Sequence, residues 1–310
     1  MNNSTSDIRW LDREEINIVK WDQRIITAPN GLIYARSFYL DAMAENWSAL
    51  VAGDYEYVMP LTWNRKYGFS YLYQPYFANA LGVFGPNDQP FEVSSFLKKI
   101  PKKYSYWDID LNENNIIPNL DFNSHYYTRI NYFLGLKDDY EKIKTGYKRL
   151  ATRMNKKATE SNLEIFRDRQ AAEIIRLYQI HYAKKHPSIS ERVWERLKRC
   201  MEIAFQNNLG DTYVASSPAG EPIAFYIMLK DQKFIYSLLG GSTQEGKKLG
   251  AFYFLTDAII RDHASSGKIF RFEGSDMSGI SFFNSMFGPE KTKYIHLKMN
   301  KLPFPFRLFK

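Results

Sequence analysis

Residues 234–275 decide the fold, and they read FIYSLLGGSTQEGKKLGAFYFLTDAIIRDHASSGKIFRFEGS. The apolar opening predicts a β-strand, the glycines and lysines after it predict a basic loop, and the apolar spacing that follows predicts a helix. A second predicted strand ends in Glu-Gly-Ser. A glycine-rich turn between a strand and a helix N-terminus is suited to hold a phosphate. The stretch therefore suggests an enzyme that uses a phosphate-bearing donor.

The composition is that of a globular protein with an unusual aromatic content. Of 310 residues, 45% are hydrophobic, 25% are charged and 16% are aromatic. Because two packed cores need fewer rings than this, we expect some of them to line a cleft or an interface. The net charge of +8 favours anionic ligands without choosing between nucleic acid and a cofactor phosphate.

Cysteine and histidine usage gives no sign of a metal site. The single cysteine, Cys200, excludes an intramolecular disulfide and a cysteine-based zinc site, and the five histidines lack metal-ligand spacing. No run approaches the roughly 18 apolar residues of a membrane span, and the N-terminus lacks an apolar signal core, so we expect a cytoplasmic protein. Contact with a membrane surface stays open, because the C-terminal KLPFPFRLFK is basic and aromatic.

Both halves of the sequence follow one order of elements. In each, a helix precedes three antiparallel strands with tight turns, and a further helix and strand follow. The expected meanders are 49–52, 57–63 and 69–74 in the first half, and 212–216, 222–229 and 234–239 in the second. The repetition predicts a duplicated α+β domain with a mixed, mostly antiparallel sheet flanked by helices, at residues 1–137 and 138–310. The alternative is two mixed domains that share this order by chance.

A basic helix is expected between the halves. Residues 139–162 carry apolar side chains at helical spacing on one face and many lysines and arginines on the other. Most of these charges fit a solvated surface. Arg149 and Arg153, one turn apart, are the candidates to face an anion.

Several short motifs together resemble the FemAB-like branch of the GNAT acyltransferase superfamily over about residues 30–302. They are Val58–Leu61, Gln74–Phe77, Leu81–Phe84, the helix Tyr147–Ala158, Gly240–Ala251, Phe272–Ser275 and Phe282–Gly288. The resemblance implies two GNAT-type domains in tandem, the second preceded by the linking basic helix. It also implies direct attack of an amine on an acyl donor within a ternary complex. The donor is expected to be acyl-CoA or aminoacyl-tRNA, although the helical arm that cell-wall members use for transfer RNA has no counterpart here.

The resemblance assigns donor binding to the glycine-rich loop. GNAT enzymes hold the pyrophosphate with a loop of the type Gln/Arg-x-x-Gly-x-Gly/Ala, and Lys247–Phe252 matches it approximately, with Phe252 in place of the small second residue. The expected donor-binding residues are Gly240, Gly241, Ser242, Gly246, Lys247, Lys248, Gly250 and Ala251. A glycine-rich connection with only a packing role is the alternative.

Acyl transfer needs a base for the amine and a proton for the leaving group. Glu273 is the expected general base, acting through a water, and its alternative role is that of a turn acceptor. Tyr236 or Tyr253 would supply a hydroxyl to the leaving group, unless each is only a packed ring. Ser242 would bind the oxyanion or a phosphate.

An aromatic loop that begins at Gln74 stands in the first half where the second half has its glycine-rich loop. Gln74, Tyr76 and Asn79 are expected to shape an acceptor pocket between the two domains. The acceptor would be a small molecule or a cell-envelope precursor.

Three functions follow from the sequence. The first is an acyl- or aminoacyltransferase that acts on an amine. The second is a catalytically silent GNAT-like protein that binds an anionic or nucleotide-sugar ligand, and the departure at Phe252 motivates it. The third is a nucleic-acid binder that would use the basic helix and exposed aromatic residues. The sequence contains no recognised nucleic-acid motif, so no DNA partner is expected.

Overall fold

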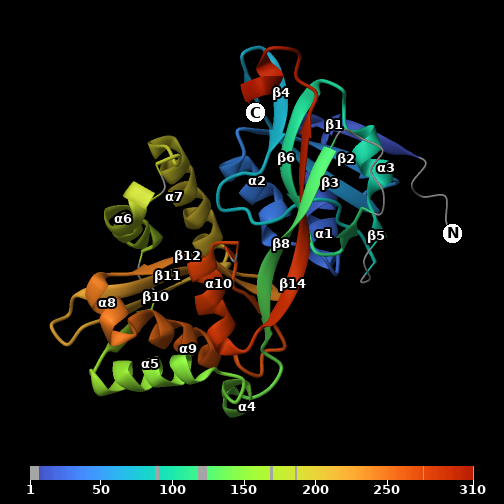
Figure 1. Cartoon of the computed structure of the whole chain (residues 1–310). Helices are drawn as coiled ribbons and strands as arrows, with labels where there is room; N and C mark the ends of the chain where they lie inside the picture. The colour runs from blue at the N-terminus through green and yellow to red at the C-terminus, as the bar shows by residue number, and fades with distance from the viewer. Residues whose placement is uncertain are drawn as a thin grey trace. The chain divides into compact units, whose positions relative to one another are not determined.

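Internal contacts divide the chain into two units. The computed structural model describes residues 7–87, 91–117, 124–167, 170–185, 187–274 and 276–309. Unit 1 comprises Met1–Arg129 and Lys293–Lys310, and unit 2 comprises Ile130–Thr292 (Figure 1). The C-terminal strand thus packs with unit 1, whereas the sequence suggested one division after residue 137.

Unit 1 is built on a sheet with the strand order β1-β2-β3-β4-β6-β14. Its neighbours are antiparallel except for the pair β4 and β6, which is parallel. The strands are β1 (Ile8–Asp12), β2 (Asn46–Ala52), β3 (Tyr57–Lys66), β4 (Phe69–Tyr73), β6 (Tyr104–Leu111) and β14 (Glu290–Asn300), with a separate pair β5 (Phe91–Glu92) and β7 (Asn115–Ile116). The helices are α1 (Ile18–Thr27), α2 (Ser37–Met43) and α3 (Ser94–Lys99).

Unit 2 repeats this plan with the strand order β9-β10-β11-β12-β13-β8. Again one pair, β12 and β13, is parallel. The strands are β8 (Ser124–Gly135), which begins in unit 1, β9 (Glu164–Arg167), β10 (Gly210–Ser216), β11 (Pro222–Lys230), β12 (Phe234–Ser242) and β13 (Ile269–Arg271). The helices are α4 (Tyr140–Lys144), α5 (Arg149–Glu160), α6 (Ala171–Tyr182), α7 (Glu191–Gln206), α8 (Gln244–Leu249), α9 (Ala251–His263) and α10 (Ser278–Asn284). The predicted duplication is confirmed.

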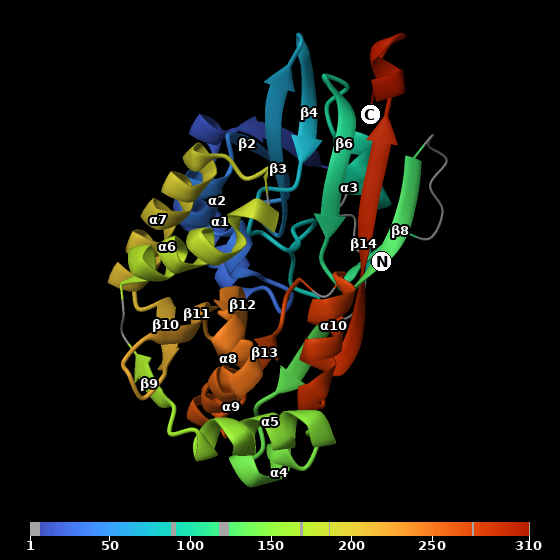
Figure 2. The ribbon, with the colours of Figure 1, turned by 60° about the vertical axis from the view of Figure 1, so that its left-hand side comes forward.

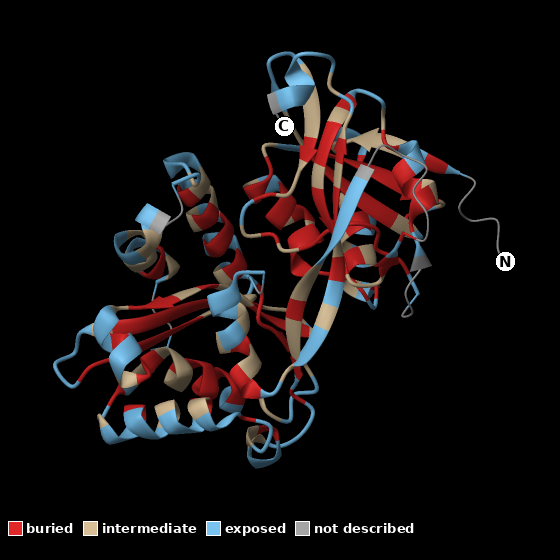
Figure 3. Cartoon of the chain, viewed as in Figure 1, coloured by how far each residue is buried: buried red, intermediate tan, exposed pale blue. Residues whose placement is uncertain are grey.

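Helices cover both faces of the unit 2 sheet. In Figure 1, α6 and α7 lie on one side of it, and α9, backed by α5, lies on the other. Helix α9 buries an apolar face that includes Leu255 and Ile259, while α5 buries Ala151 and Ala158 and leaves its charges exposed. Each unit has its own buried core, and the buried residues of its strands are red in Figure 3.

Two predicted segments differ in the structure. The expected helix over 139–162 is broken into α4 and α5 at Gly146, where the chain approaches Gly288 so closely that a Cβ on Gly288 would lie 2.5 Å from the Gly146 carbonyl oxygen. The expected basic loop after the strand is instead the end of β12 and the short helix α8, and Gly250, with φ +78°, separates α8 from α9, the helix that was expected. Strand β8 was not predicted.

Candidate functional site

The strands β12 and β13 separate soon after they pair. Their parallel ladder joins only Phe234 to Ile269, Ile235 to Phe270 and Tyr236 to Arg271. Beyond this point Phe272 donates its backbone N–H to β8, while β12 continues beside β11 to Ser242 (Figure 2). Within the described residues, 237–242 therefore have no strand partner on the β13 side.

A β-bulge lies at the same place. On β11 the consecutive residues Ile227 and Met228 pair with Leu239 and Ser237, so Leu238 is the extra residue on β12. A bulge bends its strand and redirects backbone groups, and bulges are frequent beside active sites. No feature of the sequence predicts it, because the segment FIYSLL around Leu238 contains no glycine, proline or other turn signal.

Aromatic rings cover the glycines at the end of β12. A Cβ on Gly240 would lie 2.6 Å from the Tyr226 ring and 3.0 Å from the Phe252 ring, and one on Gly241 would lie 2.5 Å from Tyr182. Phe252 stacks on Tyr226 with ring centroids 4.4 Å apart. The Tyr182 hydroxyl in turn donates to the Ser242 carbonyl oxygen and accepts from the Ser242 N–H. These glycines therefore make room for rings.

The glycines around α8 allow close backbone packing. Gly246 donates its N–H to the Thr243 hydroxyl, which caps the helix, and a Cβ there would lie 2.0 Å from the Ile223 carbonyl oxygen. At Gly250 a Cβ would lie 2.6 Å from the Met154 carbonyl oxygen of α5. The packing role that the sequence left open accounts for both residues. Their contact with a phosphate, and that of Ala251 at the start of α9, stays a prediction.

Exposed cations lie on the two helices that meet at Gly250. Lys247 and Lys248 occupy the last turn of α8, and Arg149 and Arg153 lie on α5, which packs against α8 and α9. Among the described residues, none of the four has an ion-pair partner. The α8–α9 junction thus has a positive surrounding, which favours an anionic ligand.

Glu273 is buried and held by several donors. One carboxylate oxygen accepts from Arg271 Nε at 3.0 Å and the other from Asn131 Nδ2 at 2.6 Å. Asn284 donates to the Glu273 carbonyl oxygen. With φ +48°, Glu273 has a strained backbone that these contacts fix. They also stabilise the ionised carboxylate, so a proton transfer to Glu273 must compete with them. Asn131 was not predicted as a site residue, because the sequence analysis did not predict strand β8, which carries it.

The two candidate tyrosines differ in their hydroxyl contacts. Tyr236 is fully buried and donates to Asp231 at 2.6 Å, which ties the end of the β11–β12 hairpin. The Tyr253 ring packs against Phe283, with centroids 4.7 Å apart, and burial raises the pKa of its hydroxyl. Burial thus makes Tyr253 a weaker acid than a free tyrosine, but Tyr253 is the remaining candidate because Asp231 already engages the Tyr236 hydroxyl.

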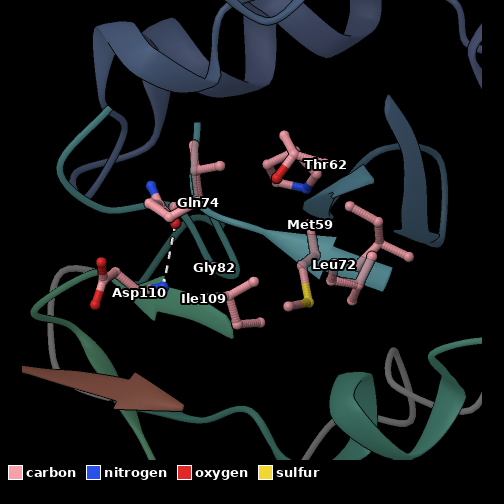
Figure 4. A pocket seen from close by; sticks show the side chains of 10 residues that line it. Met59, Thr62, Leu72, Gln74, Gly82, Ile109 and Asp110 are labelled. Atoms are coloured by element: carbon pink, nitrogen blue, oxygen red, sulfur yellow. Dashed lines mark hydrogen bonds between the residues drawn. The ribbon is translucent and has the colours of Figure 1, made fainter. Parts of the chain in front are cut away.

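In unit 1, Gln74 closes the aromatic loop onto β6. Its Oε1 accepts from the Asp110 N–H at 3.1 Å and its Nε2 donates to the Ala78 carbonyl oxygen (Figure 4). The cavity beside it measures about 10 Å³, which is room for about one water. Gln74 is thus committed to the loop, whereas Tyr76 is 41% exposed and Asn79 accepts from Tyr294 at 3.4 Å.

A histidine between two carboxylates was also missed. His296 Nδ1 lies 2.9 Å from Asp110 and its Nε2 lies 3.3 Å from Asp108, while Arg129 pairs with Asp110 at 2.8 Å. Burial lowers the pKa of His296, but the hydrogen bonds to both carboxylates outweigh it, so the pKa is raised. His296 stands 186 residues from Asp110, too far for a local motif.

The described part of the chain has neither a cluster of metal ligands nor a helix suited to span a membrane. It contains no group of three or more His, Cys, Asp or Glu side chains arranged to hold a metal ion. None of its helices combines the length and apolarity needed to cross a membrane.

A family model matches part of the chain. Residues 142–274 match the model of an acetyltransferase (GNAT) domain. This segment contains β12, α8, α9, β13 and Glu273. Unit 2 therefore holds a GNAT-type domain.

Solved structures extend the likeness to the whole chain. FemX superposes with a TM-score of 0.63 at 10% identity, over 97% of this chain and 99% of that one. The C-terminal domain of a putative lysylphosphatidylglycerol synthetase from Agrobacterium fabrum gives 0.54 at 10% identity, over 94% of both chains. A tandem GNAT protein from the clavulanic acid biosynthesis pathway gives 0.51 at 9% identity, over 94% and 98%. No curated protein matches the sequence. The chain has the fold of a FemAB-like tandem GNAT protein, as predicted.

Proposed function

We propose that this protein transfers an acyl or aminoacyl group to an amine. The observation that carries the proposal is the separation of β12 from β13, which leaves the edge of residues 237–242 without a strand partner among the described residues of a GNAT-type domain. An extended acyl donor can pair with such an edge as an added strand would, with its carbonyl on a backbone N–H of β12.

The residues at this edge have complementary roles. Glu273 accepts the amine proton through a water, and Arg271 and Asn131 fix its position. The amine attacks the donor carbonyl directly, and backbone N–H groups near the bulge at Leu238 stabilise the oxyanion. Ser242 lies about 13 Å further along β12 and is assigned to a donor phosphate. Tyr253 then donates its proton to the leaving group.

The donor carries phosphate, in keeping with the cations Lys247, Lys248, Arg149 and Arg153. Acyl-CoA and aminoacyl-tRNA both meet this requirement. The acceptor is a small molecule or a cell-envelope precursor, with Tyr76 and Asn79 as its proposed contacts. Similarity to a protein named for lysylphosphatidylglycerol supports the aminoacyl form of the reaction.

A silent binding protein is the second candidate. Two observations favour it: the Phe252 ring covers Gly240, and both oxygens of Glu273 already accept hydrogen bonds. Such a protein would bind an anionic or nucleotide-sugar ligand without turnover.

Calorimetric titration separates the two candidates. We expect acetyl-CoA, a longer acyl-CoA or an aminoacyl-tRNA to bind, and the double variant Lys247→Ala/Lys248→Ala to weaken that binding about tenfold. Lys98→Ala/Lys99→Ala is the matched control, because these lysines occupy the last turn of α3, a helix as short as α8. Binding of a nucleotide sugar without affinity for any of the donors would favour the silent protein.

A further inference from the structure

One end of the unit 1 sheet exposes aromatic and aliphatic side chains. Here the β3–β4 hairpin meets the C-terminal segment: the Phe306 ring lies 5.1 Å from Phe69 and 6.5 Å from Tyr67, between centroids. Tyr67 is 75% exposed, Phe304 82% and Leu308 72%. Figure 1 shows the C-terminus beside β4, and Figure 3 shows this end largely exposed. We call residues 64–69 and 300–309 the end patch.

The charges of the end patch have one sign. Its ionisable residues are Arg65, Lys66, Lys301 and Arg307, and its sequences, NRKYGF and NKLPFPFRLF, contain no Asp or Glu. Lys66 lies over the Tyr67 ring at 5.2 Å. The end patch thus combines exposed apolar side chains with positive charges.

The hairpin turn places an aromatic residue where the backbone disfavours it. Tyr67 has φ +51° and is followed by Gly68 with φ +84°, a turn that ordinarily takes Asn, Asp or Gly first. A bulky residue in this conformation lowers stability, and Tyr67 recovers little by burial because most of it is exposed. The side chain is therefore better explained by a contact outside the chain.

The segment that carries Phe304 and Leu308 is held in place. Asn300 donates from its side chain to the Arg307 carbonyl oxygen at 3.1 Å, and the Lys301 N–H donates to the Ser105 carbonyl oxygen at 2.8 Å. The exposed side chains of Phe304 and Leu308 thus project from a segment that is fixed by hydrogen bonds.

We propose that the end patch docks on an anionic lipid bilayer. The four cations of the end patch attract the negatively charged phosphates of lipids. The exposed apolar side chains of Tyr67, Phe304 and Leu308 are suited to insert between the lipid headgroups. Two short segments are smaller than the roughly 20–30 residues a side of a stable protein interface. The proposal is independent of acyl transfer.

Sedimentation with vesicles tests the proposal. The full chain binds vesicles of phosphatidylglycerol and phosphatidylcholine at least tenfold more tightly than vesicles of phosphatidylcholine alone, and salt weakens this binding. Tyr67→Asn/Phe304→Ser/Leu308→Ser lowers the affinity at least tenfold. Val19→Ser/Ile180→Ser, which removes exposed apolar side chains elsewhere, leaves it unchanged.

A second variant distinguishes a loss of vesicle binding from a loss of folding. Tyr67→Asn alone raises the unfolding temperature, because Asn suits the turn, and lowers vesicle affinity. Equal binding to neutral and anionic vesicles, or a triple variant that binds normally, would overturn the proposal. So would a dimer in analytical ultracentrifugation that the triple variant dissociates, since the patch would then join two copies of this chain.

Discussion

The corresponding parallel strand pairs of the two units differ: β4 and β6 stay joined in unit 1, whereas β12 and β13 separate early in unit 2. In unit 1, β4 and β6 stay paired to the end of β4, where Tyr73 faces Asp108. The chain after β4 is then fastened to β6, since Gln74 accepts from the Asp110 N–H and Leu81 donates to the Asp110 carbonyl oxygen. In unit 2, β12 leaves β13 after Tyr236 and no such fastening occurs within the described residues.

This difference shows how one fold, used twice, can yield one site. The closed end of unit 1 leaves a cavity of about 10 Å³, too small for a donor. The open end of unit 2 leaves an edge beside Glu273, with cations on α5 and α8. We therefore propose donor chemistry for unit 2, while the proposed contribution of unit 1 is the acceptor contact at Tyr76 and Asn79.

The largest expected effect tests whether the open end performs chemistry. Glu273→Gln keeps the side-chain shape but removes the base, so turnover should fall about 10²–10⁴-fold while donor affinity stays within about twofold. Steady-state kinetics and calorimetry measure the two quantities. Tyr236→Phe is the control, because its hydroxyl is engaged by Asp231. Unchanged turnover in Glu273→Gln would remove this residue from the mechanism.

An intermediate effect is expected when the closed end is loosened. Gln74→Ala leaves the Asp110 N–H and the Ala78 carbonyl oxygen without their partner, which should cost about 1–3 kcal/mol of unfolding free energy. Urea denaturation measures it. Donor binding should not change, because the site lies in unit 2. A large loss of donor affinity in this variant would show that the comparison is wrong.

The smallest effect concerns one histidine in each unit. The raised pKa of His296 stabilises unit 1 below about pH 6.5, and this contribution is lost as the pH rises through the folded-state pKa. Burial lowers the pKa of His263, so its contribution has the opposite sign and grows as the pH rises. His296→Gln and His263→Gln should therefore change the slope of stability with pH in opposite directions. Equal slopes in both variants would contradict the assignment.

The duplicated order of elements and the strands with alternating apolar residues could be predicted from the sequence. The two meanders follow from period-two apolar runs with turn residues, and both are present. The glycine-rich segment was expected as a loop, but it forms the end of β12 and helix α8. The break at Gly146 could not be predicted, because it depends on contact with Gly288, far along the chain.

The candidate site was predicted only in part. Glu273 and the glycine-rich segment were candidates because they adjoin recognisable elements, and their roles stay predictions. Asn131 and Arg271, which hold the Glu273 carboxylate, depend on the pairing of β8 with β13, and the bulge at Leu238 depends on the register of β11. The pairing of β8 with β13 joins segments far apart in the chain, so no local sequence pattern predicts it.

Hydrogen exchange with bound donor tests the central claim most directly. Peptides covering 237–253 and 74–85 are followed with saturating acetyl-CoA, a long-chain acyl-CoA and an aminoacyl-tRNA. The account predicts that at least one donor slows exchange at 237–253 and none does so at 74–85. Protection confined to 74–85, or no protection by any donor, would contradict a donor site at the open end of unit 2.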